Sequence, residues 1–131
     1  MPGRIASALI ASLLVIHATP VLADACEGIQ VPSPQSYIPT GIKFYNDTHY
    51  AMRVYWADFK GNLREYGILQ PDEIAGFKTY ANHRWFVEVY TPDGDYCSGP
   101  ISAPDTEQCD MRILFDDNEQ LVGLDGGYCD Y

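Results

Sequence analysis

Basic residues and long apolar runs are scarce in this sequence. Its 131 residues contain 8 lysines and arginines against 18 aspartates and glutamates, which gives a net charge of −10. A chain this acidic does not neutralise a phosphate backbone, so we expect no nucleic-acid partner. Residues 6–16 form an apolar run that is too short to span a bilayer comfortably. No later stretch approaches the length of a membrane span, and we expect no membrane contact once this run is removed.

The apolar run belongs to a segment with the layout of a secretory signal peptide. Arg4 precedes the run, and small residues follow it at positions 21–23 and 23–25. This order is typical of a leader that is cleaved on export. The sequence therefore predicts a signal peptide over residues 1–23, cleavage after Ala23 or Ala25, and a secreted or periplasmic protein. Cleavage after Ala23 removes Arg4 and leaves a net charge of 7 − 18 = −11.

Motifs for catalysis and metal binding are also missing. Only His49 and His83 follow the predicted leader, and there is no Gly-x-Ser-x-Gly turn and no Cys-x-x-Cys pair. The acids of residues 116–119 suggest calcium, but their spacing does not match a calcium loop and fits exposed turns better. We therefore expect no enzyme activity, no cofactor and no metal. A small hydrolase acting through His83 is the least favoured alternative.

Four cysteines follow the predicted leader: Cys26, Cys97, Cys109 and Cys129. An even number in an oxidising compartment predicts two disulfides, each worth about 2–4 kcal/mol of stability. Three pairings are possible, and the sequence does not choose between them. Free thiols are a less favoured alternative. A lipid anchor on Cys26 is also less favoured, because residues 23–25 fit a lipid-attachment site poorly.

The chain after the leader divides into three parts. Residues 24–39 hold three prolines without a periodic pattern and predict an extended lead-in. Residues 40–100 hold nearly all the strand-like sequence. Residues 101–131 carry eight acids against Arg112 alone and predict an acidic, cysteine-containing hairpin packed on the same domain. Asn46-Asp47-Thr48 matches a glycosylation sequon, which matters only in a eukaryotic source.

Short strand-like segments rich in tyrosine, phenylalanine, valine and tryptophan alternate with turn residues. We expect strands at residues 42–45, 52–57, 64–69, 74–80, 85–90 and 96–98, and a last hairpin of 111–115 and 120–124. Asp93-Gly94 marks a strong hairpin turn. No amphipathic helix is apparent. The sequence thus predicts an all-β fold, a small antiparallel β-sandwich of about 7–8 strands stabilised by disulfides.

Aromatic and polar residues gather on or beside four successive predicted strands. They are Trp56, Tyr66, Thr79, Tyr80, His83 and Trp85. Core packing is the plain interpretation, but tyrosine and tryptophan carry polar tips that need partners. Such a group can receive a ring with a polar substituent, with Thr79 and His83 bonding its hydroxyl.

Four segments of the middle part resemble the β domain of the von Hippel–Lindau tumour suppressor family. They are residues 42–48, 54–62, 66–71 and 79–86, and the resemblance runs over residues 40–98. The ordered motifs include Trp56-x-x-Phe-x-Gly and Tyr80-x-x-His-x-Trp at matching spacing. On these motifs the chain is identified as an exported, stand-alone member of that family, and residues 40–100 as its β domain.

The resemblance implies a β-sandwich that binds a hydroxyproline-containing peptide laid along a sheet. By position, Trp56 and Trp85 form the aromatic wall against the proline ring, and Tyr66 supports the ring and bonds peptide backbone. Thr79 replaces a serine that bonds the hydroxyl of hydroxyproline, and His83 matches the histidine that shares this bond. Without that hydroxyl, the two buried groups lose a partner, which costs about 1–3 kcal/mol.

Three features depart from the family's pattern. Thr79 keeps the hydroxyl of the serine that it replaces but adds a methyl group, which narrows the pocket. Lys78 stands where the family has a second histidine, which puts part of the peptide track in doubt. Nothing after residue 100 resembles the helical α domain that recruits elongin and cullin, so we expect neither partner and no role in ubiquitin ligation. The expected ligand site is Trp56, Tyr66, Lys78, Thr79, Tyr80, His83 and Trp85. The alternative is a structural or interaction domain that kept this framework without binding a ligand.

Overall fold

The computed structural model describes residues 25–29, 31–105 and 109–125, so the predicted signal peptide lies outside the described residues. The described part has eight strands and no helix, hence no helix long and apolar enough to cross a membrane. The strands are β1 (Pro39–Asn46), β2 (Met52–Ala57), β3 (Leu63–Leu69), β4 (Ile74–Tyr80), β5 (Arg84–Thr91), β6 (Gly94–Ser102), β7 (Cys109–Phe115) and β8 (Leu121–Asp125). Each predicted strand is present, and β1 and β6 extend further than expected.

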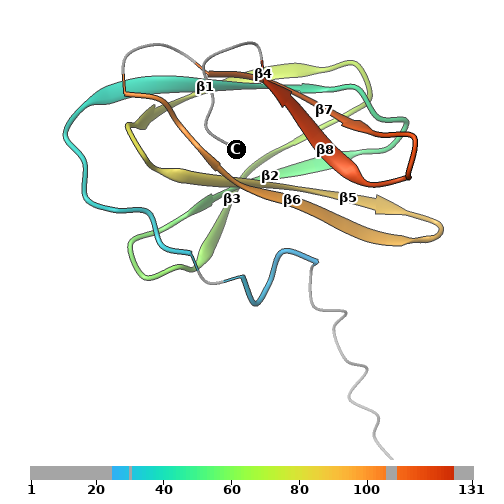
Figure 1. Ribbon diagram of the computed structural model, residues 1–131, viewed down its shortest axis with the longest axis horizontal. Helices are drawn as coiled ribbons and strands as arrows, with labels where there is room; N and C mark the ends of the chain where they lie inside the picture. The colour runs from blue at the N-terminus through green and yellow to red at the C-terminus, as the bar shows by residue number, and fades with distance from the viewer. Residues whose placement is uncertain (1–24, 30, 106–108, 126–131) are drawn as a thin grey trace, which may run out of the picture.

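The strands form two four-stranded sheets that pack face to face (Figure 1). The first sheet has the order β4-β1-β7-β8 and the second the order β3-β2-β5-β6. The predicted all-β sandwich is confirmed, with one difference from a fully antiparallel arrangement. β1 and β7 run parallel, with Ile42 opposite Cys109, because the chain crosses over from β6 in the other sheet before β7 begins.

The core between the sheets follows the two-residue alternation of the strands. In β2, Met52 and Val54 point into this core, whereas Tyr55 and Ala57 belong to a second buried cluster. The largest side chains of the first core include Phe44 and Trp85. Phe77 stacks on Trp85, with ring centroids 5.3 Å apart, and so ties β4 of the first sheet to β5 of the second.

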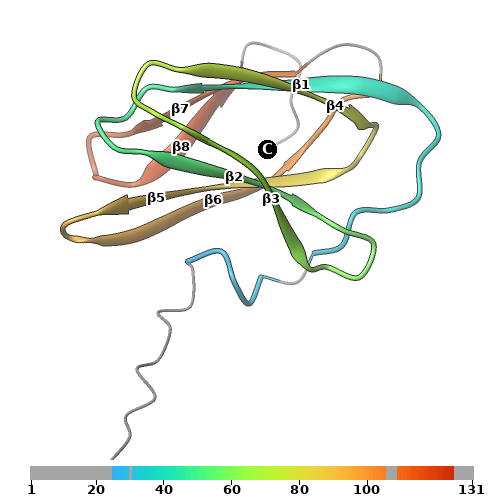
Figure 2. The ribbon, with the colours of Figure 1, turned by 180° about the vertical axis from the view of Figure 1, so that it is seen from behind.

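The lead-in covers the outer face of the second sheet. It runs along this sheet in both opposite views of the molecule (Figures 1 and 2). A disulfide joins Cys26 to Cys97 of β6, and Cys26 packs with Tyr55, Ala57 and Phe86 in the second buried cluster. β5 is therefore buried on both faces, which explains its run of consecutive buried residues.

The Cys26–Cys97 disulfide decides between alternatives that the sequence leaves open. It confirms the disulfide-stabilised fold and identifies Cys97 as the partner of Cys26. A sulfur in a disulfide is not available for lipid attachment, so the bond excludes a lipid anchor on Cys26. The side chain of Cys109 and the whole of Cys129 lie outside the described residues.

Two further sequence features have structural roles. Asn46 of the sequon is 0% exposed, and its Nδ2 donates to the carbonyls of Tyr50 and Leu69 at 2.8 and 3.0 Å. An amide enclosed in this way is not accessible to glycosylation. Asp116 holds the β7–β8 turn, since its Oδ1 accepts the backbone N–H groups of Asn118 and Gln120. The aspartate at this position therefore acts as a turn residue.

Candidate functional site

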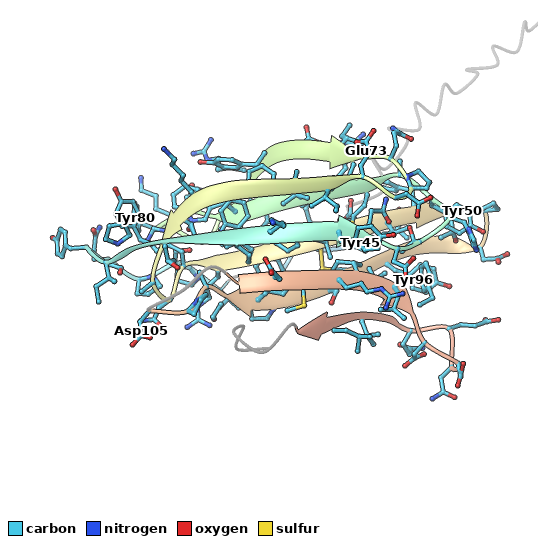
Figure 3. The ribbon with its side chains drawn as sticks, turned by 90° about the horizontal axis from the view of Figure 1, so that it is seen from above. Tyr45, Tyr50, Glu73, Tyr80, Tyr96 and Asp105 are labelled. Atoms are coloured by element: carbon cyan, nitrogen blue, oxygen red, sulfur yellow. A yellow bond between two sulfur atoms is a disulfide. The ribbon has the colours of Figure 1, made fainter. Side chains whose placement is uncertain are left out.

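A hollow of about 280 Å³ lies where the two sheets meet at the β3 and β4 edges. Its lining comes from the lead-in, from β2 to β5 and from the turns between them. The lining residues are Ser36, Trp56, Phe59, Tyr66, Lys78, Thr79, Tyr80, His83 and Trp85. Figure 3 shows Tyr80 at one end of the sandwich, far from Tyr50 and Tyr96 at the other end. All seven residues predicted as ligand site thus share one cavity.

Trp85 and Thr79 form the floor of the hollow. Trp85 is only 1% exposed and Thr79 6%. The indole Nε1 of Trp85 donates a hydrogen bond to Oγ1 of Thr79 at 3.1 Å. This bond satisfies the polar tip of a buried tryptophan and leaves the threonine its own O–H proton to donate. Trp85 is therefore a buried floor and not an exposed wall.

Trp56 and His83 form a second bonded pair beside the floor. Nε1 of Trp56 donates to Nδ1 of His83 at 3.1 Å, and the two rings lie 5.6 Å apart at 32°. Because Nδ1 accepts, it carries no proton, and the proton of the neutral ring sits on Nε2. His83 is 4% exposed, and Nε2 is buried without a hydrogen-bond partner among the described residues.

The protonation state of His83 follows from its burial. Burial lowers the pKa of His83 below its ordinary value of 6.5. The carbonyl of Pro34 raises this pKa by a smaller amount, although it does not reach Nε2 in hydrogen-bonding geometry. The ring is therefore neutral at pH 7, which is the form that can accept the indole N–H of Trp56.

The turn between β4 and β5 places His83 against the hollow. Asn82 takes a left-handed backbone conformation with φ 66°, which asparagine tolerates. The N–H of His83 bonds the carbonyl of Tyr80 at 3.1 Å, and its carbonyl accepts from Ala103 at 3.1 Å. The main chain of His83 is thus fixed by two backbone hydrogen bonds, which helps to position its imidazole.

Exposed side chains form the rim. Tyr66 is 50% exposed, and its ring lies edge-on to Trp85 at 5.2 Å and to Trp56 at 6.3 Å. Tyr80 is also half exposed, with its ring 5.6 Å from His83. Lys78 is exposed and is the one lysine or arginine among the lining residues. The rim therefore offers phenol groups and a single positive charge around an aromatic interior.

Two lining residues are missing from the predicted site. Phe59 lies edge-on to Trp56 and to His83, with both ring separations 5.5 Å. It belongs to the Trp-x-x-Phe-x-Gly motif, so the motif itself could have indicated it. Ser36 comes from the lead-in, and nothing in its local sequence marks it as part of a site.

A comparison with family models identifies the family of this chain. The model of the VHL beta domain, in which VHL stands for von Hippel–Lindau, matches residues 31–95, about half the chain. The chain belongs to the VHL beta domain family. The match includes every lining residue of the hollow, and it ends before β7 and β8.

In this VHL beta domain the set predicted from the family's motifs is gathered in one place. A chain of contacts links His83 to Trp56, Trp56 to Tyr66, Tyr66 to Trp85 and Trp85 to Thr79, with Lys78 and Tyr80 on the rim. The predicted roles of Thr79 and His83 change in one respect. Oγ1 of Thr79 and Nδ1 of His83 each already accept a hydrogen bond from an indole N–H, so these two atoms have partners without a ligand.

Comparisons with curated proteins and with solved structures gave different results. No curated protein matches the chain. Among solved structures, a protein from Eubacterium rectale has 15% identity and a TM-score of 0.48, covering 72% of this chain and 94% of its own. Pneumolysin has 8% identity and a TM-score of 0.45, covering 66% of this chain and 23% of its own. Listeriolysin O has 9% identity and a TM-score of 0.46, covering 68% of this chain and 23% of its own.

Proposed function

We propose that this protein is an exported binding module that takes the ring of a proline or hydroxyproline residue from an extended peptide into the hollow. One observation carries the proposal: a hydroxyl and a neutral imidazole lie inside an aromatic cavity, each positioned by the N–H of a tryptophan. Aromatic faces suit an apolar ring, and the two polar groups suit a substituent on it. On the rim, Tyr66 and Lys78 are free to meet peptide carbonyl groups.

The bonding pattern sets how a ligand hydroxyl would be held. Its oxygen can accept the O–H of Thr79 directly, because Thr79 receives its bond from Trp85 on another electron pair. To donate to Nδ1 of His83, the ligand hydroxyl must replace the N–H of Trp56. We therefore count only the bond from Thr79, and we expect a preference for hydroxyproline over proline of about 2–12-fold, since a net hydrogen bond is worth about 0.5–1.5 kcal/mol.

Peptide titration tests this function. Two capped nine-residue peptides, identical except for a central proline or 4-hydroxyproline, are titrated calorimetrically into the mature protein. We expect both to bind, with hydroxyproline tighter, and Thr79→Val to remove the difference. Thr79→Ser is the matched control, since it keeps the hydroxyl. Absence of binding by both peptides would refute the proposal.

The same geometry supports a non-enzymatic role. A hydrolase that used His83 as a base would need a serine or threonine hydroxyl to donate to its free nitrogen. The acceptor Nδ1 of His83 is instead occupied by the indole N–H of Trp56. We accordingly propose a peptide or protein ligand, no cofactor, and no elongin, cullin or nucleic-acid partner.

A structural or interaction domain is the second candidate. The observation in its favour is that Trp85, Thr79 and His83 are almost fully buried, as core residues are. Tyr66→Ala separates the two readings because this ring is half exposed. A binding module should lose peptide affinity with little change in unfolding free energy, whereas a structural domain has no peptide affinity to lose.

Export is proposed on two grounds. The sequence has the layout of a signal peptide at residues 1–23, and a disulfide joins Cys26 to Cys97. Cell fractionation with the natural leader should find the protein outside the cytoplasm. Recovery in the cytoplasm, with the leader intact, would contradict this part of the proposal.

A further inference from the structure

A buried carboxylate outside the hollow has no matching positive charge among the described residues. Glu88 of β5 is 0% exposed, on the face of the second sheet that the lead-in covers. Its Oε2 accepts a hydrogen bond from the backbone nitrogen of Cys26 at 3.0 Å, and its Oε1 accepts one from the hydroxyl of Tyr55 at 3.4 Å. Both donors are neutral, and the second bond is long. A carboxylate buried with such partners is costly unless a cation neutralises it.

No lysine or arginine supplies that cation among the described residues. Arg53 lies directly opposite Glu88 in the strand register, but its guanidinium pairs with Glu65 at 3.4 Å and lies over the ring of Tyr90. The other described ion pairs join Arg64 to Asp58 and Arg112 to Asp47.

The nitrogen of Cys26 is held in place at the carboxylate. The side chain of Cys26 is bonded to Cys97, and Cys97 lies opposite Glu88 in the β5–β6 register. In the sequence this nitrogen belongs to the peptide bond after Ala25, one of the two positions at which small residues permit leader cleavage. Cleavage after Ala25 would therefore free the same nitrogen that donates a hydrogen bond to the buried carboxylate of Glu88.

We propose that the leader is removed between Ala25 and Cys26, and that the new α-ammonium group of Cys26 forms a buried ion pair with Glu88. Water hydrolyses the peptide bond, Ala25 keeps the carboxylate and the nitrogen of Cys26 becomes an amine. That amine is protonated near neutral pH, because an α-amino group has a pKa of about 7.7–8.0. A charged donor then replaces a neutral one, which makes the hydrogen bond shorter and stronger.

Cleavage after Ala23 would not produce this pair. It would leave the nitrogen of Cys26 as a neutral peptide N–H, with the acidic Asp24 two residues before it. The inference rests on the proposed export and is independent of any ligand in the hollow.

The mature N-terminus tests the inference directly. The protein is expressed with its own leader, purified from the exported fraction, and its first residue is read by N-terminal sequencing and intact mass. We expect Cys26. A chain that begins at Asp24 or at any other residue overturns the inference and leaves peptide binding in the hollow untouched. An uncleaved chain overturns export as well.

The ion pair is tested by comparing forms that begin at Cys26 or at Asp24, each with Glu88 or with Glu88→Gln. We expect the Cys26 form to melt higher by about 4–8 °C, the shift that a modest interaction produces in a domain of this size. In Glu88→Gln this difference should vanish. Where Glu88→Gln does not fold, acetylation of the Cys26 amine in the unchanged protein should lower Tm equally. An equal difference in both backgrounds, or no effect of acetylation, contradicts the ion pair.

Discussion

At the scale of single residues, the two tryptophans of the hollow act through their nitrogens as well as their rings. Trp85 positions Thr79, and Trp56 positions His83, each by one hydrogen bond of 3.1 Å. A hydroxyl and an imidazole with fixed partners have few orientations to lose when a ligand binds. For the binding function that we propose, the hollow is thus organised in advance, which would reduce the entropy cost of binding.

The hydroxyl of Thr79 should contribute measurably to stability. Thr79→Val removes the acceptor and leaves the buried N–H of Trp85 without a partner, which should lower the free energy of unfolding by about 1–3 kcal/mol. Thr79→Ser keeps the acceptor and should retain most of the stability. Urea unfolding followed by tryptophan fluorescence measures both. A Thr79→Val variant as stable as the natural protein would contradict this contribution of the bond, because valine keeps the methyl group and loses only the hydroxyl.

His83 should make the fold less stable in mild acid. Its folded pKa is lowered by burial, so the unfolded chain binds a proton more readily than the folded one. This contribution to stability is complete above the ordinary pKa of about 6.5 and is lost as pH falls from there toward the lowered folded pKa. Thermal unfolding between pH 7 and 5 should show the decrease in the natural protein. In His83→Asn the same pH range should give a smaller decrease, and an identical one would contradict the assignment.

At the scale of elements, β6 approaches β5 more closely than a side chain would allow. Gly99 has φ 141°, and a Cβ at this position would lie 2.6 Å from Cδ1 of Phe86 and 2.9 Å from the carbonyl oxygen of Trp85. The register between β5 and β6 shifts at Trp85 and Val87, at the same place. The irregularity lies next to the floor of the hollow, so it helps to position Trp85.

Gly99→Ala should therefore disturb the fold strongly. Backbone strain and overpacking together should lower the free energy of unfolding by about 2–4 kcal/mol. Gly94→Ala is a matched control in the same strand, because Gly94 has φ 138° but no atom within 4 Å of the added Cβ. It should cost only the backbone strain, about 1–2 kcal/mol. Chemical denaturation ranks the two, and a Gly94 variant that is equally damaged would argue against crowding at Gly99.

The strands themselves are predictable because alternation and turn residues mark them locally. Every predicted strand occurs, and the Trp-x-x-Phe-x-Gly and Tyr-x-x-His-x-Trp motifs identify the residues of the hollow. The parallel pairing of β1 with β7 is not predictable in this way, since it depends on contacts between distant segments. The packing of the lead-in on Phe86 is likewise invisible in a proline-rich sequence with few apolar residues. Nor does the sequence reveal that the indole N–H groups of Trp85 and Trp56 donate hydrogen bonds to Thr79 and His83.

At the scale of the whole molecule, the acidic carboxyl-terminal part belongs to the fold. Residues 101–131 supply eight of the 18 acids, yet β7 and β8 complete the first sheet beside β1. Three of the eight acids, Asp116, Asp117 and Glu119, lie in the β7–β8 turn, where Asp116 organises the backbone. None of the described acids of this part lines the hollow.

A second disulfide should join Cys109 and Cys129. Four cysteines in an exported protein predict two disulfides, and Cys26 is bonded to Cys97, which leaves these two as partners. Peptide mapping without reduction should recover a fragment in which both are linked. Alkylation of both residues by a thiol reagent under native conditions would disprove the pair.

The parallel pairing of β1 with β7 also determines when the protein can fold. β1, the first strand of the sandwich, can pair with β7 only after the chain has been synthesised as far as β7, and distant pairings of this kind form slowly. Until then, β1 lacks one side of its sheet and the core around Phe44 and Met111 stays open. For a chain exported as we propose, we expect this order of strands to delay folding until β7 has left the ribosome, which would favour an unfolded state during export.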